Sequence, residues 1–153
     1  MRTITVSFFG HRRISGYRCL EEQVESIVCG LLGANEYLEF LVGRNGDFDR
    51  LVSSTIRRIK KECGFKNCAL VWVMPYMLRE YEKNEASFHA YYDEIEICDE
   101  ASAVHFKEAY TVRNQRMIDR SDIVVIHAVY THGGAYQALM YAQKTQKHII
   151  RIG

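Results

Sequence analysis

Proline, net charge and long apolar runs are all scarce in this sequence of 153 residues. One proline and ten glycines leave little room for long disordered linkers. The formal net charge is +1, whereas a protein whose main task is to coat nucleic acid carries a basic excess. We therefore do not expect nucleic acid as a partner, although a small local anion site stays open. No apolar run approaches the roughly 20 residues of a membrane span, so we expect neither a membrane protein nor a signal peptide.

Cysteine and histidine pairs at metal-binding spacing are also missing. The five cysteines lie at positions 19, 29, 63, 68 and 98. Their number is odd, and no C-x-x-C pair occurs. The six histidines are scattered, and none pairs with another at ligand spacing. We expect free thiols in a reducing cytosol, hence a cytoplasmic protein, with no metal site and no cofactor.

Strand-like and helix-like patterns alternate along the chain. Five runs of β-branched and aromatic residues predict strands, at 3–9, 37–42, 68–74, 122–128 and 148–152. Apolar residues at three- and four-residue steps predict helices between most of them, over 17–32, 48–63, 103–119 and 134–145. Such alternation with unbroken apolar strands indicates parallel pairing with right-handed crossovers. The sequence therefore predicts a single α/β domain over residues 1–153, a three-layer Rossmann-like fold with a mainly parallel sheet.

Residues 75–101 interrupt this alternation. Pro75 follows the third predicted strand directly, and the segment is rich in acids and tyrosines. We interpret it as a solvated, irregular excursion with a short strand near 93–98. The alternative is a lid over a ligand crevice.

The first loop of interest follows the strand at 3–9. Ligands of open parallel sheets bind beyond the carboxyl ends of the strands, so these loops matter most. Gly10 can adopt dihedral angles closed to other residues and let a ligand approach the backbone. His11 and Arg12 come next, and an arginine here can form a bidentate pair with phosphate. The alternative is a turn with solvated charges.

The second loop is the stretch GRNGDFDR. Gly43 and Gly46 bracket Arg44 there, and Asp47 is a candidate helix N-cap. A glycine-rich turn that opens a helix exposes backbone N–H groups at the positive end of the helix dipole, which suits an anion. Asp49 could accept a hydrogen bond from a ribose hydroxyl. The alternative is simple helix capping.

The third loop is the stretch YTHGGAYQA. Thr131, Gly133 and Gly134 form another turn that leads into a helix and could hold an anion. If the strands at 3–9 and 122–128 are neighbours, this loop faces the first across one crevice.

Two polar residues in the middle of the helix predicted at 103–119 are harder to interpret. Arg113 and Asn114 either point to solvent, or one of them reaches the crevice or orders a neighbouring loop.

Four short motifs together resemble the SLOG superfamily. These are Rossmann-like domains related to the DNA-processing protein DprA and to the LOG phosphoribohydrolases; the chain is most similar to a bacterial and phage branch. The motifs span residues 8 to 135 in the family's order: F-x-G-H-R at Phe8–Arg12, V-G-x-x-G-x-F-D at Val42–Asp49, R-N-x-x-M-I-x-x-S-D at Arg113–Asp122, and T-H-G-G-A at Thr131–Ala135.

The resemblance implies a Rossmann-like fold with a pocket for a nucleotide or a nucleotide-derived ligand. The residues it points to are Gly10, His11, Arg12, Gly43, Gly46, Asp49, Arg113, Asn114, Gly133 and Gly134. The phosphoribohydrolases carry a P-G-G-x-G-T-x-x-E motif, and Met140 stands here where its glutamate belongs. A methionine can neither move a proton nor stabilise a cationic centre, which weakens the hydrolase interpretation.

We therefore expect a module that binds or senses a nucleotide-like small molecule at the C-terminal edge of the sheet. Backbone N–H groups at Gly133 and Gly134, with the guanidinium of Arg12 or Arg44, would hold its phosphate. Whether the protein is an enzyme stays open: the alternative is a nucleoside-phosphate glycosidase or phosphohydrolase with His11 as the catalytic acid/base. The least favoured alternative is a single-strand nucleic-acid binder by analogy with DprA, through the cationic face of the helix at 48–63. A homo-oligomer is also left open.

Overall fold

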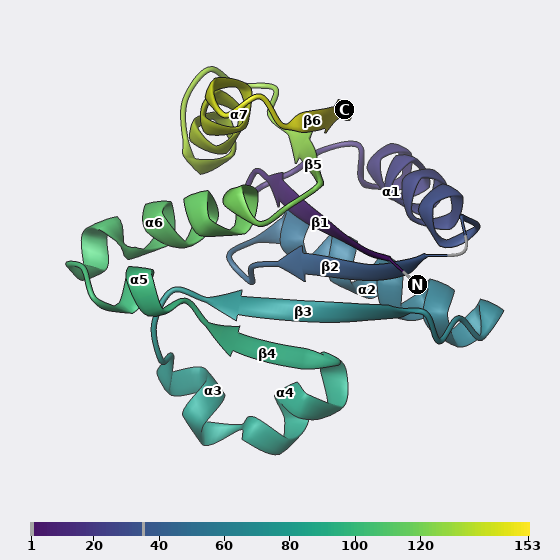
Figure 1. Cartoon of the computed structure of the whole chain (residues 1–153), viewed down its shortest axis with the longest axis horizontal. Coiled ribbons are helices and arrows are strands. Elements are labelled where there is room, and N and C mark those ends of the chain that lie inside the picture. Colours follow the sequence, from purple (N-terminus) through teal and green to yellow (C-terminus); the bar gives the residue numbers. More distant parts are fainter. Residues whose placement is uncertain (1, 35) are drawn as a thin grey trace.

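Six parallel strands form one sheet in the computed structural model, which describes residues 2–34 and 36–153. The strand order is β4-β3-β2-β1-β5-β6, and each neighbouring pair runs parallel (Figure 1). The strands are β1 (Thr3–Gly10), β2 (Tyr37–Val42), β3 (Cys68–Met74), β4 (Glu94–Ile97), β5 (Ile123–His127) and β6 (His148–Arg151). The predicted three-layer, Rossmann-like α/β fold is confirmed.

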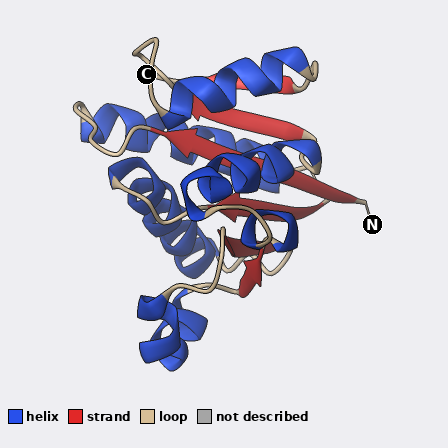
Figure 2. Cartoon of the chain, turned by 90° about the vertical axis from the view of Figure 1, so that its left-hand side faces the viewer, coloured by secondary structure: helices blue, strands red, loops and turns tan. Residues whose placement is uncertain are grey.

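Helices cover both faces of the sheet (Figure 2). They are α1 (Tyr17–Leu32), α2 (Asp47–Cys63), α3 (Arg79–Lys83), α4 (Glu85–Tyr91), α5 (Asp99–Ser102), α6 (Phe106–Asp119) and α7 (Gly134–Lys144). The apolar residues of α1 and α2 belong to one core, and those of α6 and α7 to the other. Over the described ranges, none of these helices has the length and apolarity needed to pass through a membrane.

Strand β3 shows why the predicted strands read as unbroken apolar runs. Leu70 and Trp72 point into the core under α1 and α2, while Val71 and Val73 point into the core under α6 and α7. Successive side chains of a strand alternate between the faces, so a sheet covered on both faces needs apolar residues at every position.

The point where strand order reverses lies between β1 and β5. The chain moves outward from β1 through β2 and β3 to β4, then returns to place β5 and β6 on the other side. The predicted pairing of the first strand with the strand at 122–128 is confirmed, with register from Val6 opposite Ile123 to Gly10 opposite His127. Ligand sites of doubly wound sheets occur at such a reversal.

Residues 75–101 hold α3, α4, β4 and the start of α5. Strand β4 lies within the short strand predicted near 93–98 and forms the edge of the sheet next to β3. Tyr81, Phe88 and Tyr91 pack against the same core as α1 and α2. The segment is thus an ordered extension of that layer, and its role as a lid stays a prediction.

Candidate functional site

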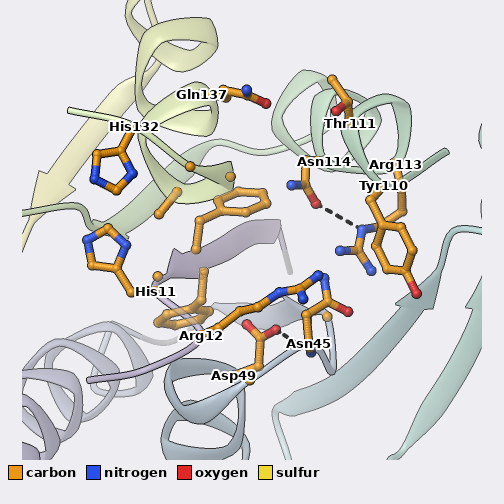
Figure 3. Close-up of a pocket in the computed structure, with 18 residues that line it drawn as sticks. His11, Arg12, Asn45, Asp49, Tyr110, Thr111, Arg113, Asn114, His132 and Gln137 are labelled. Atoms are coloured by element: carbon orange, nitrogen blue, oxygen red, sulfur yellow. Dashed lines mark hydrogen bonds between the residues drawn. The ribbon is translucent and has the colours of Figure 1, made fainter. Parts of the chain in front are cut away.

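A cavity of about 420 Å³ opens at the carboxyl ends of β1 and β2, against α6 and the start of α7 (Figure 3). It is lined by most of the residues singled out from the sequence: Gly10, His11, Arg12, Gly43, Gly46, Asp49, Arg113, Asn114, Gly133 and Gly134. The loops after the first and fifth strands therefore face each other across one cavity, as the predicted strand pairing required. Arg44 and Thr131 are not part of its lining.

Gly10 and Gly46 allow close packing of backbone and side chains around the cavity. A Cβ at Gly10 would overlap the ring of Phe48 on α2. A Cβ at Gly46 would lie 2.5 Å from the Cα of Arg12. At that contact the N–H of Asp47 donates to the carbonyl of Arg12 at 2.8 Å. These glycines therefore fix the loop after β1 against the loop after β2, a role that sequence analysis did not assign to them.

Arg113 is the buried cation of the site. Its side chain comes from α6, and the residue is 2% exposed. Nη1 donates to the carbonyl of Val73 at 2.8 Å, and Nε donates to Oδ1 of Asn114 at 2.9 Å. Gly43 makes room for the guanidinium, since a Cβ there would lie 3.0 Å from Nη2. Of the two alternatives for this residue, the structure therefore places its side chain in the crevice.

No ion pair among the described residues includes Arg113. Burial lowers the pKa of its guanidinium, and the nearby carboxylate of Asp49 opposes that shift. An arginine stays protonated even so, because its ordinary pKa is far above neutral pH. The cavity wall thus carries a desolvated positive charge without a carboxylate in contact.

Asp49 faces Arg113 and Arg12 from the start of α2. Its Oδ2 accepts the N–H of Asn45 at 2.8 Å. Burial raises the pKa of this carboxyl, while the Asn45 hydrogen bond and the guanidinium groups of Arg113, Arg12 and Arg50 oppose the rise. The Asp49 side chain therefore stabilises the loop after β2 through its hydrogen bond with Asn45. A hydrogen bond from Asp49 to a ribose hydroxyl stays a prediction.

Two residues of this loop are placed differently from what the sequence suggested. Asp47 is not the N-cap of α2: the cap is Gly46, without a side-chain cap bond, and Oδ2 of Asp47 instead accepts the N–H of Ile14 at 3.3 Å. Arg44 does not line the cavity. Its Nη1 instead forms an ion pair with Oε2 of Glu80 at 3.2 Å. Its Cζ lies 4.9 Å from the ring centroid of Phe88.

The N-terminus of α7 forms the opposite wall. Gly133 has φ +90° and ψ 178°, a conformation that side chains disfavour, and it caps the helix. The first N–H groups of a helix have no partner within the helix and carry partial positive charge. Gly133, Gly134 and Ala135 line the cavity, so these groups face the same space as the guanidinium of Arg113.

His11 connects the loop after β1 to the loop after β5 through a hydrogen bond. Its Nε2 accepts the N–H of Val129 at 3.0 Å, and its ring lies 5.2 Å from that of His127. Burial lowers the pKa of His11, with further lowering from His127 and His132. The imidazole is therefore neutral near pH 7, and the lone pair that a catalytic base would use is already bonded.

Several lining residues were not predicted from the sequence, namely Asn45, Tyr110, Thr111, His132 and Gln137. For two of them the sequence offered an indication, namely helical spacing from a predicted site residue. Tyr110 lies three residues before Arg113 and Gln137 three after Gly134, and residues three apart share a helix face. Figure 3 shows Arg12 and Asn45 near Arg113, with His11 and His132 on the far side of the cavity.

No protein-family model matches the sequence, and no curated protein matches it. Among solved structures, the chain is similar to DNA processing protein A from Helicobacter pylori, whose structure is described for its single-stranded DNA binding mode. The TM-score is 0.65 at 17% identity, and the match covers 97% of this chain and 64% of that one. At 17% identity, this similarity shows a shared fold and does not by itself show a shared function.

This neighbour corrects the expectation that nucleic acid is not a partner. That expectation relied on the formal net charge of +1. A protein with the same fold binds single-stranded DNA. Net charge sums the whole surface, whereas binding depends on the local field in a groove, so the sum does not exclude such a partner.

Proposed function

We propose that the cavity binds a nucleotide or a nucleotide-derived ligand through its phosphate. The observation that carries this proposal is the Arg113 guanidinium, which is 2% exposed, lines the cavity and forms no ion pair at contact distance among the described residues, with Asp49 acting on it only through its field. Burying an unpaired charge is strongly unfavourable. An anionic ligand supplies the missing partner, and a planar guanidinium suits phosphate oxygens.

Each wall has a part in this binding. Arg113 and the N–H groups at the start of α7 hold the phosphate between them, and Arg12 adds charge at the mouth. Asn45 and Asn114 offer hydrogen bonds to a sugar or a base, whereas Gln137 lies on the first turn of α7, beside the N–H groups assigned to the phosphate. The volume of about 420 Å³ falls within the range of small-molecule sites.

The resemblance to the SLOG superfamily supports the same ligand class, because the residues it points to meet in this cavity. The likeness to DNA processing protein A favours a second candidate, in which the nucleotide is a unit of a DNA single strand. Both candidates use the same phosphate contacts. Catalysis by His11 gains less support, since its Nε2 already accepts a hydrogen bond from Val129.

Isothermal titration calorimetry tests the proposal with nucleoside monophosphates, ADP-ribose, a cyclic dinucleotide and a single-stranded oligodeoxynucleotide. We expect micromolar or tighter binding of at least one. Steep salt dependence for the oligonucleotide would identify the strand as the ligand. Release of base or phosphate over hours, lost in His11→Ala, would identify an enzyme. No heat from any ligand would overturn the proposal.

Matched variants on α7 give the first prediction. Gln137 is exposed and lines the cavity, whereas Gln143 is exposed on the same helix outside it. Gln137→Glu places a negative charge beside the phosphate, so affinity should fall at least about tenfold. Gln143→Glu makes the same chemical change elsewhere and should leave affinity within about twofold. Equal losses in both variants would contradict binding in this cavity.

A further inference from the structure

A second cavity, of about 520 Å³, lies between α2 and α4 on the other side of the loop that follows β2. Asp49 lines both cavities, so the two are adjacent. Three aromatic side chains of its wall come from the segment after β3: Phe88, Tyr91 and Tyr92. Figure 1 shows α3 and α4 beyond β4, and neither helix contains any of the four motifs. The proposed phosphate site makes no use of this cavity.

Ser53 is the first sign that the second cavity has an occupant. This α2 residue lines the cavity and is 2% exposed. Its Oγ has no partner in full hydrogen-bond geometry among the described residues; the Tyr92 hydroxyl on the same cavity wall is near enough for Ser53 to oppose the rise that burial causes in the pKa of that phenol. Buried hydroxyl groups nearly always have a partner, because losing water without gaining a hydrogen bond is unfavourable. A ligand atom in the cavity would supply that partner.

The aromatic wall is the second sign. The ring of Phe88 lies 5.0 Å from that of Trp72 in the core beneath it. The guanidinium of Arg44 covers Phe88 at 4.9 Å, and Glu80 holds it there at 3.2 Å. Aromatic rings and a flat guanidinium are the groups on which planar ligands stack.

We propose that the second cavity binds a nucleobase, which stacks on the aromatic wall and hydrogen-bonds to the hydroxyl of Ser53. The cavity is suited to a flat ring with polar edges because aromatic rings and the guanidinium of Arg44 line it together with the buried Ser53 hydroxyl. The choice of a nucleobase over another flat ring rests on the proposed function, since Asp49 adjoins the cavity assigned to phosphate. The second site takes its base without phosphate contacts.

Trp72 provides the measurement, because it is the single tryptophan of the chain and its ring lies 5.0 to 6.0 Å from those of Phe88, Tyr92 and Tyr81. Adenosine, guanosine, cytidine and thymidine, which lack phosphate, are titrated one at a time while its fluorescence is recorded. At least one should cause a saturable change. If none of the four nucleosides changes the fluorescence, this inference is overturned. The phosphate proposal still holds in that case if nucleoside monophosphates bind.

Ser53→Ala tests the location. We expect affinity for the nucleoside to fall at least about fivefold, through loss of one hydrogen bond. The matched control is Thr55→Val, which removes a buried hydroxyl of α2 that bonds to the Leu51 carbonyl at 2.7 Å and lines neither cavity. It should leave nucleoside affinity unchanged. Because the Ser53 hydroxyl makes no fully formed hydrogen bond within the described residues, Ser53→Ala should unfold at nearly the same urea concentration as the natural protein.

Two further variants separate this site from the first. Ser87 is exposed and lines the second cavity, so Ser87→Tyr should fill it and abolish the fluorescence response without disturbing the core. Gln137→Glu, in the first cavity, should weaken nucleoside monophosphates and leave nucleosides unaffected. Nucleoside binding that survives Ser53→Ala and Ser87→Tyr, or that Gln137→Glu removes, overturns the assignment.

Discussion

Arg113 is a cation held inside the protein by a carbonyl and an amide, without a carboxylate in contact. Two hydrogen bonds fix its direction, and Gly43 leaves the space it occupies. Its charge is therefore positioned before any ligand arrives, so little side-chain freedom is lost on binding. This arrangement is what makes a phosphate the favoured ligand of the first cavity.

Asn114→Asp tests that charge. The new carboxylate would pair with the guanidinium of Arg113 at the position where Asn114 Oδ1 now accepts. Pairing a buried charge should raise the free energy of unfolding by about 1 kcal/mol or more, and affinity for nucleoside monophosphates should fall at least about tenfold. Urea denaturation and calorimetry measure the two effects. Asn114→Ala is the control: it removes the amide without adding charge, so it should not gain stability.

His11 makes a second prediction at a single position. Its pKa is lowered in the folded protein from 6.5. As pH falls below that value, the unfolded chain takes up the proton first, so the free energy of unfolding decreases until the pKa of folded His11 is reached. In His11→Gln, whose amide oxygen can accept the Val129 N–H, this decrease should be smaller. Urea denaturation at pH 7.5 and at about pH 5.5 measures it. An unchanged pH profile would contradict the assignment.

At the scale of an element, helix α7 has its N-terminus, the positive end of its dipole, at the cavity. Its two glycines differ in what they contribute. Gly133 has φ +90°, whereas Gly134 is the first helical residue, and a Cβ at either would meet no atom within 4 Å. Only the backbone conformation, and not crowding, distinguishes them.

Alanine at each position separates these contributions. Gly133→Ala should lower the free energy of unfolding by about 1–3 kcal/mol, because the backbone strain falls on a residue with a Cβ. Gly134→Ala should leave it unchanged or raise it by up to about 1 kcal/mol, because alanine restricts the unfolded chain more than glycine does. Urea denaturation measures both. Equal losses would show that the turn is not held in this conformation.

Element patterns were largely predictable from the sequence, and their exceptions have physical reasons. Strands such as β3 are apolar at every position because both faces are covered. Helix α6 begins at Phe106 rather than near 103, because residues 99–102 form α5 and His105 caps α6 through Nδ1. The short helices α3 and α4 are too brief to show a helical period. Their contact with Trp72 stabilises them, and a linear pattern does not report it.

At the scale of the whole molecule, the site is assembled from loops far apart in the sequence. The pairing of β1 with β5 could be predicted, so the meeting of Arg12 with Gly133 could be predicted as well. The inward direction of Arg113 could not, because a polar residue in a helix of mixed pattern points either way. The second cavity could not be predicted either, since Ser53 and Phe88 meet only through packing of α2 against α4.

Ligand binding should stabilise the whole fold, because residues from β1 to α7 line one cavity. At a ligand concentration of about 100 times Kd, the free energy of unfolding should rise by about 2.7 kcal/mol. Thermal denaturation with and without the bound nucleotide measures this rise. Gln137→Glu should lose most of the increase and Gln143→Glu should keep it. A nucleotide that binds by calorimetry but leaves Tm unchanged would contradict binding to the folded state alone.

The close approach of Gly10 to Phe48 also constrains how this protein can diverge. The ring occupies the space that any larger residue at position 10 would need. Evolutionary substitution at either position is therefore coupled to the other. Among homologues, a side chain at the position of Gly10 should coincide with a smaller residue at the position of Phe48, and an alignment should show the two columns covarying.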